Sequence, residues 1–147
     1  EKTGIRFDDD GRVQSVHLES PMTIEQPVKK RALVTGGSHG IGLAIARKFA
    51  SQGIDVAIIS RDEGRLSEAR EQLTDFGVEA LTLQADASLP DEVDSAWNAL
   101  AGVWGGVDIL INNVGGGGRW GTESILTTKA DVWSDVYQKN TGVAIYP

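Results

Sequence analysis

The chain has 147 residues, a length typical of a single domain. Hydrophobic residues make up 40% and charged residues 24% of the chain, which is the composition of an ordinary globular protein and not of a disordered one. The net charge of -7 argues against a general role in binding nucleic acid or membrane surfaces, and the absence of cysteine excludes disulfides, thiolate metal sites and cysteine nucleophiles.

Residues 1–28 differ in character from the rest and are expected to form an N-terminal extension that ends in a linker marked by Pro21 and Pro27. Apolar residues on both sides of Asp8-Asp9-Asp10-Gly11 predict a hairpin with a turn at this run. The run also invites a calcium interpretation, but Arg6 and His17 would then occupy the first and last ligand positions of the loop, where carboxylates are needed. We therefore favour a plain turn and expect no metal.

Neither a secretion signal nor a membrane span is expected. Residues 1–30 lack the apolar core of a signal peptide, and no apolar run approaches the roughly 20 residues that cross a bilayer. We therefore expect a cytoplasmic protein. The chain starts at Glu1, Met22 would be a natural start, and the final residues look like the interior of a longer sequence, so we expect a fragment.

From Lys29 onward, apolar runs alternate with segments of helical periodicity. Four buried strands are predicted, at residues 31–35, 55–60, 80–85 and 107–111. The side chains expected on one side of each intervening or following helix are Ile41, Ile45 and Phe49, then Leu66, Leu73 and Phe76, then Val93, Trp97, Leu100 and Trp104, and finally Val132, Val136, Asn140 and Val143. This alternation predicts an α/β domain over residues 29–147, with a parallel sheet covered by helices on both faces.

The first of these strands ends in a glycine turn, Thr35-Gly36-Gly37-Ser38-His39-Gly40-Ile41-Gly42, that runs directly into a helix. Gly36 can adopt the backbone angles of a tight turn, Gly40 lets the backbone approach a pyrophosphate, and Gly42 lets the helix pack closely on the sheet. An anion would lie at the helix N-terminus, where free N–H groups favour it. Because a strand precedes the turn and a helix follows it, we interpret it as a dinucleotide-binding turn and not merely a tight turn.

The chain resembles the short-chain dehydrogenase/reductase family over about residues 30–147. The family's Thr-Gly-x-x-x-Gly-x-Gly pattern matches residues 35–42 in full, and its Asn-Asn-Ala-Gly motif is present as Asn112-Asn113-Val114-Gly115, with valine in place of alanine. An aspartate after the third strand, Asp86, is a third match. The resemblance implies a Rossmann-type doubly wound parallel sheet, here incomplete, with only its first four strands and helices. In that strand order the fourth strand would be an exposed apolar edge.

The resemblance also implies which residues hold the cofactor, with the Asp86 carboxylate on the adenine amino group. The expected cofactor-binding residues are Thr35, Gly36, Ser38, His39, Gly40, Ile41, Gly42, Ser60, Arg61, Asp86, Ala87, Asn113 and Gly115.

The residues after the second strand favour NADP(H) over NAD(H). In this fold an acidic residue about 20 positions beyond the glycines binds the ribose hydroxyls of NAD. Ser60 and Arg61 stand there, and an arginine can pair with a 2′-phosphate through two hydrogen bonds. His39 stands where NADP-dependent relatives often place a basic group. The alternative is that Arg61 is a solvated loop cation whose charge is partly compensated by the adjacent Asp62.

The catalytic residues that the resemblance implies are almost all missing. In the family, a tyrosine transfers the proton, a lysine four residues later lowers its pKa, a serine orients the substrate, and an asparagine on the fourth helix holds a water in the proton relay. Asn140 resembles that asparagine, although it is also consistent with a helix asparagine without catalytic duty. Thr141 stands four residues after Tyr137, and only Pro147 follows Tyr146, so we expect the chain alone to be inactive.

The resemblance implies an oxidoreductase that transfers hydride between NADP(H) and a small-molecule carbonyl or alcohol, and that acts as a homo-oligomer without nucleic-acid or membrane partners. Two alternatives stay open: a non-catalytic NADP(H)-binding module and an inactive fragment. Trp120 and the glycine run 115–118 allow an entrance to the site, but loop packing is the favoured interpretation, and Trp133 is expected in an interface or a core.

Overall fold

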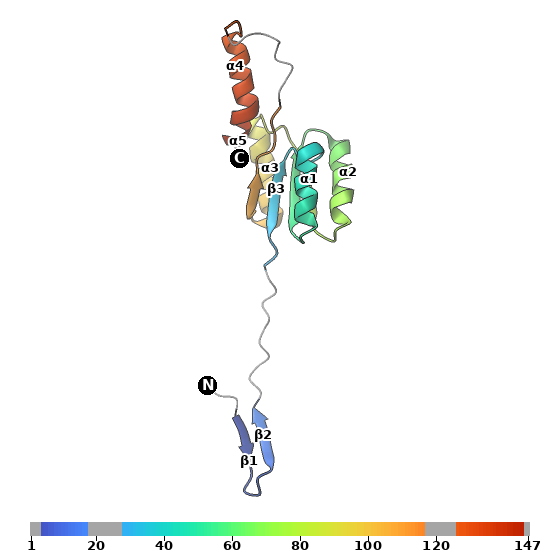
Figure 1. Ribbon diagram of the computed structural model, residues 1–147, viewed down its shortest axis with the longest axis vertical. Coiled ribbons are helices and arrows are strands. Elements are labelled where there is room, and N and C mark those ends of the chain that lie inside the picture. The colour runs from blue at the N-terminus through green and yellow to red at the C-terminus, as the bar shows by residue number, and fades with distance from the viewer. Residues whose placement is uncertain (1–3, 18–27, 117–125, 146–147) are drawn as a thin grey trace.

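The computed structural model describes residues 4–17, 28–116 and 126–145, and it is built around a parallel four-stranded sheet (Figure 1). The strands are β3 (Arg31–Thr35), β4 (Asp55–Ser60), β5 (Ala80–Gln84) and β6 (Ile109–Ile111), in the spatial order β5-β4-β3-β6. This is the order expected for the first four strands of a doubly wound sheet. The α/β fold predicted from the sequence is therefore confirmed, with a fourth strand shorter than predicted.

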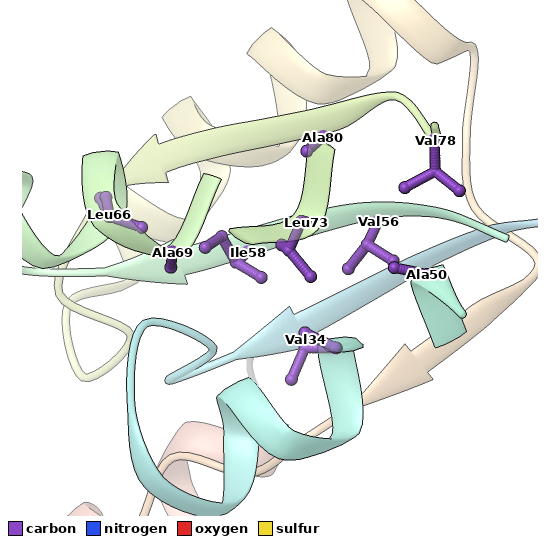
Figure 2. Packing of buried hydrophobic residues seen from close by; sticks show 10 residues of the cluster. Val34, Ala50, Val56, Ile58, Leu66, Ala69, Leu73, Val78 and Ala80 are labelled. Carbon is purple, nitrogen blue, oxygen red and sulfur yellow. The ribbon is translucent and has the colours of Figure 1, made fainter. Parts of the chain in front are cut away.

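Helices cover both faces of the sheet. One cluster of buried side chains joins β3, β4 and β5 to α1 (Gly40–Ala50) and α2 (Glu63–Thr74), and Figure 2 shows Val34 and Ile58 of the strands among the helix residues of this cluster. A second cluster joins the opposite sheet face to α3 (Pro90–Trp104) through Leu33, Ile59 and Leu100. Neighbouring strand residues belong to different clusters because successive side chains of a strand point to opposite faces.

The face of α1 that meets the sheet differs from the predicted one. Gly42, Ala46 and Ala50 are its buried residues, whereas Ile41 is 76% exposed and Ile45 and Phe49 are partly buried at the margin of the cluster. The small residues are needed because the glycine turn brings the helix close to the strands. Two other predicted helix residues also differ. Phe76 lies beyond the end of α2, and on α3 the residue that is buried is Ala96, so Trp97 is more exposed than predicted.

The last described segment contains α4 (Ala130–Tyr137), the π-helical turn η1 (Gln138–Gly142) and α5 (Val143–Ile145). The side of this helix predicted to carry Val132, Val136, Asn140 and Val143 is only partly buried: Val143 is buried, but α4 has no buried residue and Asn140 is exposed. The reason is that α4 projects past the end of the sheet instead of lying across it (Figure 1). The π-helical turn also interrupts the regular spacing on which the prediction was based.

The predicted hairpin is confirmed, as β1 (Gly4–Phe7) pairs with β2 (Val13–His17) in an antiparallel sheet of two strands. The Asp8 carboxylate accepts hydrogen bonds from the N–H groups of Asp10 (3.1 Å) and Arg12 (2.8 Å), so it is used within the turn. Pro21, Pro27, Trp120 and the second half of the glycine run lie outside the described residues. Among the helices that the structure describes, none is both long enough and apolar enough to cross a membrane.

Candidate cofactor-binding site

A cavity of about 700 Å³ opens at the carboxyl ends of the strands. It is bordered by the glycine turn, the ends of β4 and β5, the loop after β6 and two residues of the last helical segment. Of the predicted cofactor-binding residues, those that line it are Gly36, His39, Gly40, Ile41, Gly42, Ser60, Arg61, Asp86, Ala87, Asn113 and Gly115. Thr35 and Ser38 do not line the cavity, and neither does the predicted catalytic residue Asn140.

The glycine turn leaves open backbone at the start of α1. Gly36 and Gly40 have φ values of 65° and 56°, which only glycine adopts without strain. A side chain at Gly40 would meet nothing within 4 Å, so the surface above it is free for a ligand. The N-cap residue His39 makes no side-chain capping hydrogen bond. The first N–H groups of α1 are therefore free to bind an anion in the cavity.

Gly42 has a different role, which is close packing. A Cβ atom at Gly42 would collide with the carbonyl oxygen of Gly36 and lie 2.6 Å from Nδ2 of Asn113. Gly37, to which sequence reasoning gave no role, is restricted in the same way, because its Cβ would lie 2.5 Å from Cγ2 of Ile58. Both glycines thus hold the turn against the sheet.

Thr35 and Asn113 join the glycine turn to the loop after β6. The Thr35 hydroxyl accepts hydrogen bonds from the N–H groups of Asn113 (3.0 Å) and Val114 (3.2 Å). The Asn113 amide donates in return to the carbonyl oxygens of Thr35 (3.0 Å) and Gly36 (3.3 Å). These bonds use the polar atoms of the buried Thr35 within the protein, so this residue shapes the cavity without lining it.

A chain of hydroxyl groups connects the glycine turn to the end of β4. The buried Ser38 donates from its hydroxyl to that of Ser60 at 2.8 Å, and its oxygen lies 3.3 Å from Nδ1 of His39. The parallel register, in which Thr35 is opposite Ile59, brings these residues together. His39 is thereby held at the cavity wall, beside the position where Arg61 follows β4.

Arg61 forms its ion pair with Asp86 and not with Asp62. The pairing of Ser60 with Gln84 places the ends of β4 and β5 side by side, and Arg61 Nη1 lies 3.5 Å from Asp86 Oδ2. The Asp62 carboxylate instead caps α2, accepting from the N–H of Arg65 at 3.0 Å, and pairs with the Arg65 side chain at 3.7 Å. The Arg61 side chain is 78% exposed, so its ion pair is weak and easily exchanged for another anion.

Asp86 is held ionised by its neighbours. Its Oδ1 accepts from the Ser88 hydroxyl at 2.6 Å and from the Ser88 N–H at 2.9 Å. The hydrogen bond from the Ser88 side chain is the main cause that lowers the pKa of Asp86, with further contributions from the Ser88 N–H and from the charge of Arg61, while partial burial opposes the shift. Ser88 lines the cavity and was missed, although a serine two residues after an aspartate is typical of such a turn.

Asn140 contacts the glycine run at the rim of the cavity. Its side chain donates to the carbonyl oxygens of Gly116 (3.3 Å) and Val136 (2.9 Å) and accepts from the N–H of Gly116 (3.1 Å). The adjacent Lys139 lines the cavity and pairs with Asp135 at 2.7 Å. Lys139 could not be predicted as a residue of the cavity, because it belongs to the π-helical turn η1, which no sequence pattern predicted.

Known proteins resemble this chain in sequence and in fold. The chain is 36% identical over 115 residues to an uncharacterized oxidoreductase of Mycobacterium tuberculosis, a match that covers 78% of this chain and 43% of that protein. The structure resembles that of L-sorbose reductase from Gluconobacter frateurii in complex with NADPH and L-sorbose, with a TM-score of 0.73 and 35% identity over 80% of this chain and 44% of the other. It also resembles an NAD⁺-bound xylitol dehydrogenase, with a TM-score of 0.72 and 27% identity over the same shares.

The chain spans less than half the length of these relatives. The family model described as short chain dehydrogenase matches residues 30–145, which include the glycine turn, Asp86 and the Asn112–Gly115 motif. With a match over most of its length and relatives above 30% identity, the chain belongs to the short chain dehydrogenase family.

Proposed function

We propose that this chain holds NADP(H) in the cavity at the carboxyl ends of the strands. The observation that carries the proposal is the position of Arg61, which borders the cavity directly after β4. In NAD-binding proteins of this fold, the residue at this position is an acid that binds the ribose hydroxyls. Arg61 can exchange its exposed ion pair with Asp86 for a 2′-phosphate. Similarity alone does not decide between the cofactors, because related structures contain NADPH in one case and NAD⁺ in another.

Each part of the cavity then has a share in binding. The first N–H groups of α1 and the open backbone at Gly40 receive the pyrophosphate, and Asp86 and Ala87 receive the adenine. Ser60, His39 and Arg61 surround the 2′-phosphate, while Ile41 and Gly115 border the part of the cavity left for the nicotinamide. Thr35, Ser38 and Asn113 keep these groups in position.

We further propose that the protein containing this chain transfers hydride between NADP(H) and a carbonyl or alcohol group of a small molecule. The bound cofactor supplies the hydride, and the protein supplies position and electrostatics. Tyr137 is followed four residues later by Thr141 and not by a lysine, so we assign cofactor binding, and not proton transfer, to the residues that line the cavity. For Asn140 we propose a positioning role, through its hydrogen bonds to Gly116. The exposed Trp133 and Tyr137 of α4 support assembly into a homo-oligomer.

The direct test is a fluorescence titration of the chain with NADPH and, separately, with NADH. We expect saturable binding of both, with the lower dissociation constant for NADPH. A chain that melts cooperatively but binds neither nucleotide would overturn the proposal. Consumption of NADPH by the whole protein with a carbonyl compound would support the enzyme over a non-catalytic NADP(H)-binding module.

A further inference from the structure

We propose that Glu92 is a positioning residue that orients the turn between β5 and α3 so that the cavity recognises adenine by its hydrogen-bonding edge. This inference rests on the proposed cofactor role of the cavity. Glu92 is exposed on the first turn of α3 and does not line the cavity, so it acts through the residues of the turn.

The N–H groups of this turn are almost all used within the protein. Asp86 N–H donates to Oε2 of Glu92 at 2.7 Å. The N–H of Ser88 donates to Oδ1 of Asp86 at 2.9 Å, and the N–H of Leu89 donates to the Asp86 carbonyl oxygen at 3.0 Å. At the start of the turn, the N–H of Ala85 donates to the Ser60 carbonyl oxygen at 3.1 Å.

Ala87 is the exception. Within the described structure its N–H donates to no protein acceptor, although the residue is only 7% exposed and lines the cavity. A buried N–H group is rarely left unpaired, so a free one at a cavity wall indicates a place for a ligand acceptor. Next to it, the Asp86 carboxylate is an acceptor that borders the same cavity. The turn therefore presents an acceptor and a donor on adjacent residues.

This pair matches one edge of adenine. The adenine amino group donates a hydrogen bond and the neighbouring ring nitrogen N1 accepts one, so the amino group suits the Asp86 carboxylate and N1 suits the Ala87 N–H. Hypoxanthine reverses both groups, since it has a carbonyl oxygen and an N1–H. A site with this donor and acceptor would leave its polar groups unpaired against hypoxanthine and thus discriminate strongly against it.

Glu92 fixes the geometry on which this match depends. Its carboxylate accepts from the N–H of Asp86 through a charge-assisted bond, which restrains the backbone of Asp86 at the residue that precedes Ala87. Both the Asp86 side chain and the Ala87 N–H extend from this restrained backbone. Without Glu92, the N–H of Asp86 becomes a second free donor, and the remaining restraints of Asp86 are its bonds with Ser88 and Leu89.

The test compares NADPH with its hypoxanthine analogue, reduced nicotinamide hypoxanthine dinucleotide phosphate, by fluorescence titration of the wild-type chain and three variants. In Glu92→Ala we expect NADPH binding to weaken about tenfold, as the loss of one hydrogen bond to the base implies, with little change for the analogue. Glu92→Gln keeps an acceptor oxygen and should keep the preference for adenine. Asp91→Ala is the matched control, because it removes the neighbouring acid of the same helical turn and should also keep the preference.

A melting curve for each variant separates positioning from simple destabilisation. If Glu92→Ala lowers the melting temperature but keeps the wild-type ratio of the two dissociation constants, Glu92 is merely structural and the inference is wrong. Equal weakening of both nucleotides leads to the same conclusion. The proposed function would be wrong if the wild-type chain did not bind NADPH at all. If the wild-type chain bound NADPH and its hypoxanthine analogue equally well, only the recognition of adenine would be wrong.

Discussion

Thr35 and Asn113 hold each other by reciprocal hydrogen bonds: the Thr35 hydroxyl accepts from the Asn113 N–H at 3.0 Å, and the Asn113 amide donates to the Thr35 carbonyl oxygen at 3.0 Å. The two residues belong to motifs at the ends of β3 and β6, which are neighbouring strands of the sheet. The glycine turn and the loop after β6 are therefore one structural unit, and the shape of the cavity depends on both.

The Thr35 hydroxyl should contribute to stability through the two N–H groups that it accepts. In Thr35→Val the valine side chain has nearly the shape of threonine but leaves the N–H groups of Asn113 and Val114 without this acceptor. We therefore expect the free energy of unfolding to fall by about 1–3 kcal/mol. Thr35→Ser keeps the hydroxyl and should lose less. Urea unfolding of both variants measures the difference, and equal stability of the valine and serine variants would contradict the role of the hydroxyl.

Gly42 should tolerate no side chain. Gly42→Ala places a methyl group against the Gly36 carbonyl oxygen and the Asn113 amide, and we expect a loss of about 1–3 kcal/mol in the free energy of unfolding together with weaker NADPH binding. Gly102→Ala is the matched control on α3, since its Cβ would meet nothing within 4 Å. That variant should gain up to about 1 kcal/mol from helix propensity. Similar melting curves for the two variants would show that the close approach at Gly42 has no energetic consequence.

The pKa of Asp86 should depend on Ser88. Hydrogen bonds from Ser88 lower it below the ordinary value of 3.8, so ionised Asp86 stabilises the fold above that pH and the contribution is lost as the pH falls through the lower, folded-state pKa. In Ser88→Ala we expect the pKa of Asp86 to rise toward its ordinary value, which reduces the contribution of ionised Asp86 to stability and narrows the pH range over which that contribution is lost. An NMR titration of the Asp86 carboxyl carbon measures this pKa. Ser95→Ala is the control, because it removes only a hydrogen bond from the Ser95 hydroxyl to the Asp91 carbonyl oxygen. An unchanged pKa in Ser88→Ala would contradict the assignment.

The edge of β6 should promote association. β6 forms one edge of the sheet, no strand in the described part of the chain pairs with its other side, and Leu110 is 41% exposed there. We expect the 147-residue chain to associate in sedimentation velocity experiments and Leu110→Lys to reduce this association, because a charge on an edge strand disfavours pairing with another chain. Val103→Lys, an exposed position on α3, should have little effect. A monodisperse wild-type monomer would show the prediction wrong.

The strands and the position of the glycine turn could be predicted from the sequence because alternating apolar runs and glycine spacing are local signals, whereas the strand order followed from the resemblance to the family. The buried face of α1 could not, since periodicity gives weight to large residues such as Ile41, whereas the close approach of the helix requires the small Gly42 and Ala46. The partner of Arg61 could not be predicted either, because Asp86 is brought beside it only by strand pairing.

The assignment of NADP(H) to this cavity is tested by the ratio of the dissociation constants for NADH and NADPH in Arg61→Asp. We expect this substitution to lower the preference for NADPH by about 10- to 100-fold, because it replaces a cation at the 2′-phosphate by a carboxylate suited to the ribose hydroxyls. Arg65→Asp is the control, as the same charge change on α2 lies outside the cavity and should leave the ratio near the wild-type value. An unchanged ratio in Arg61→Asp would contradict the assignment of NADP(H) to this cavity.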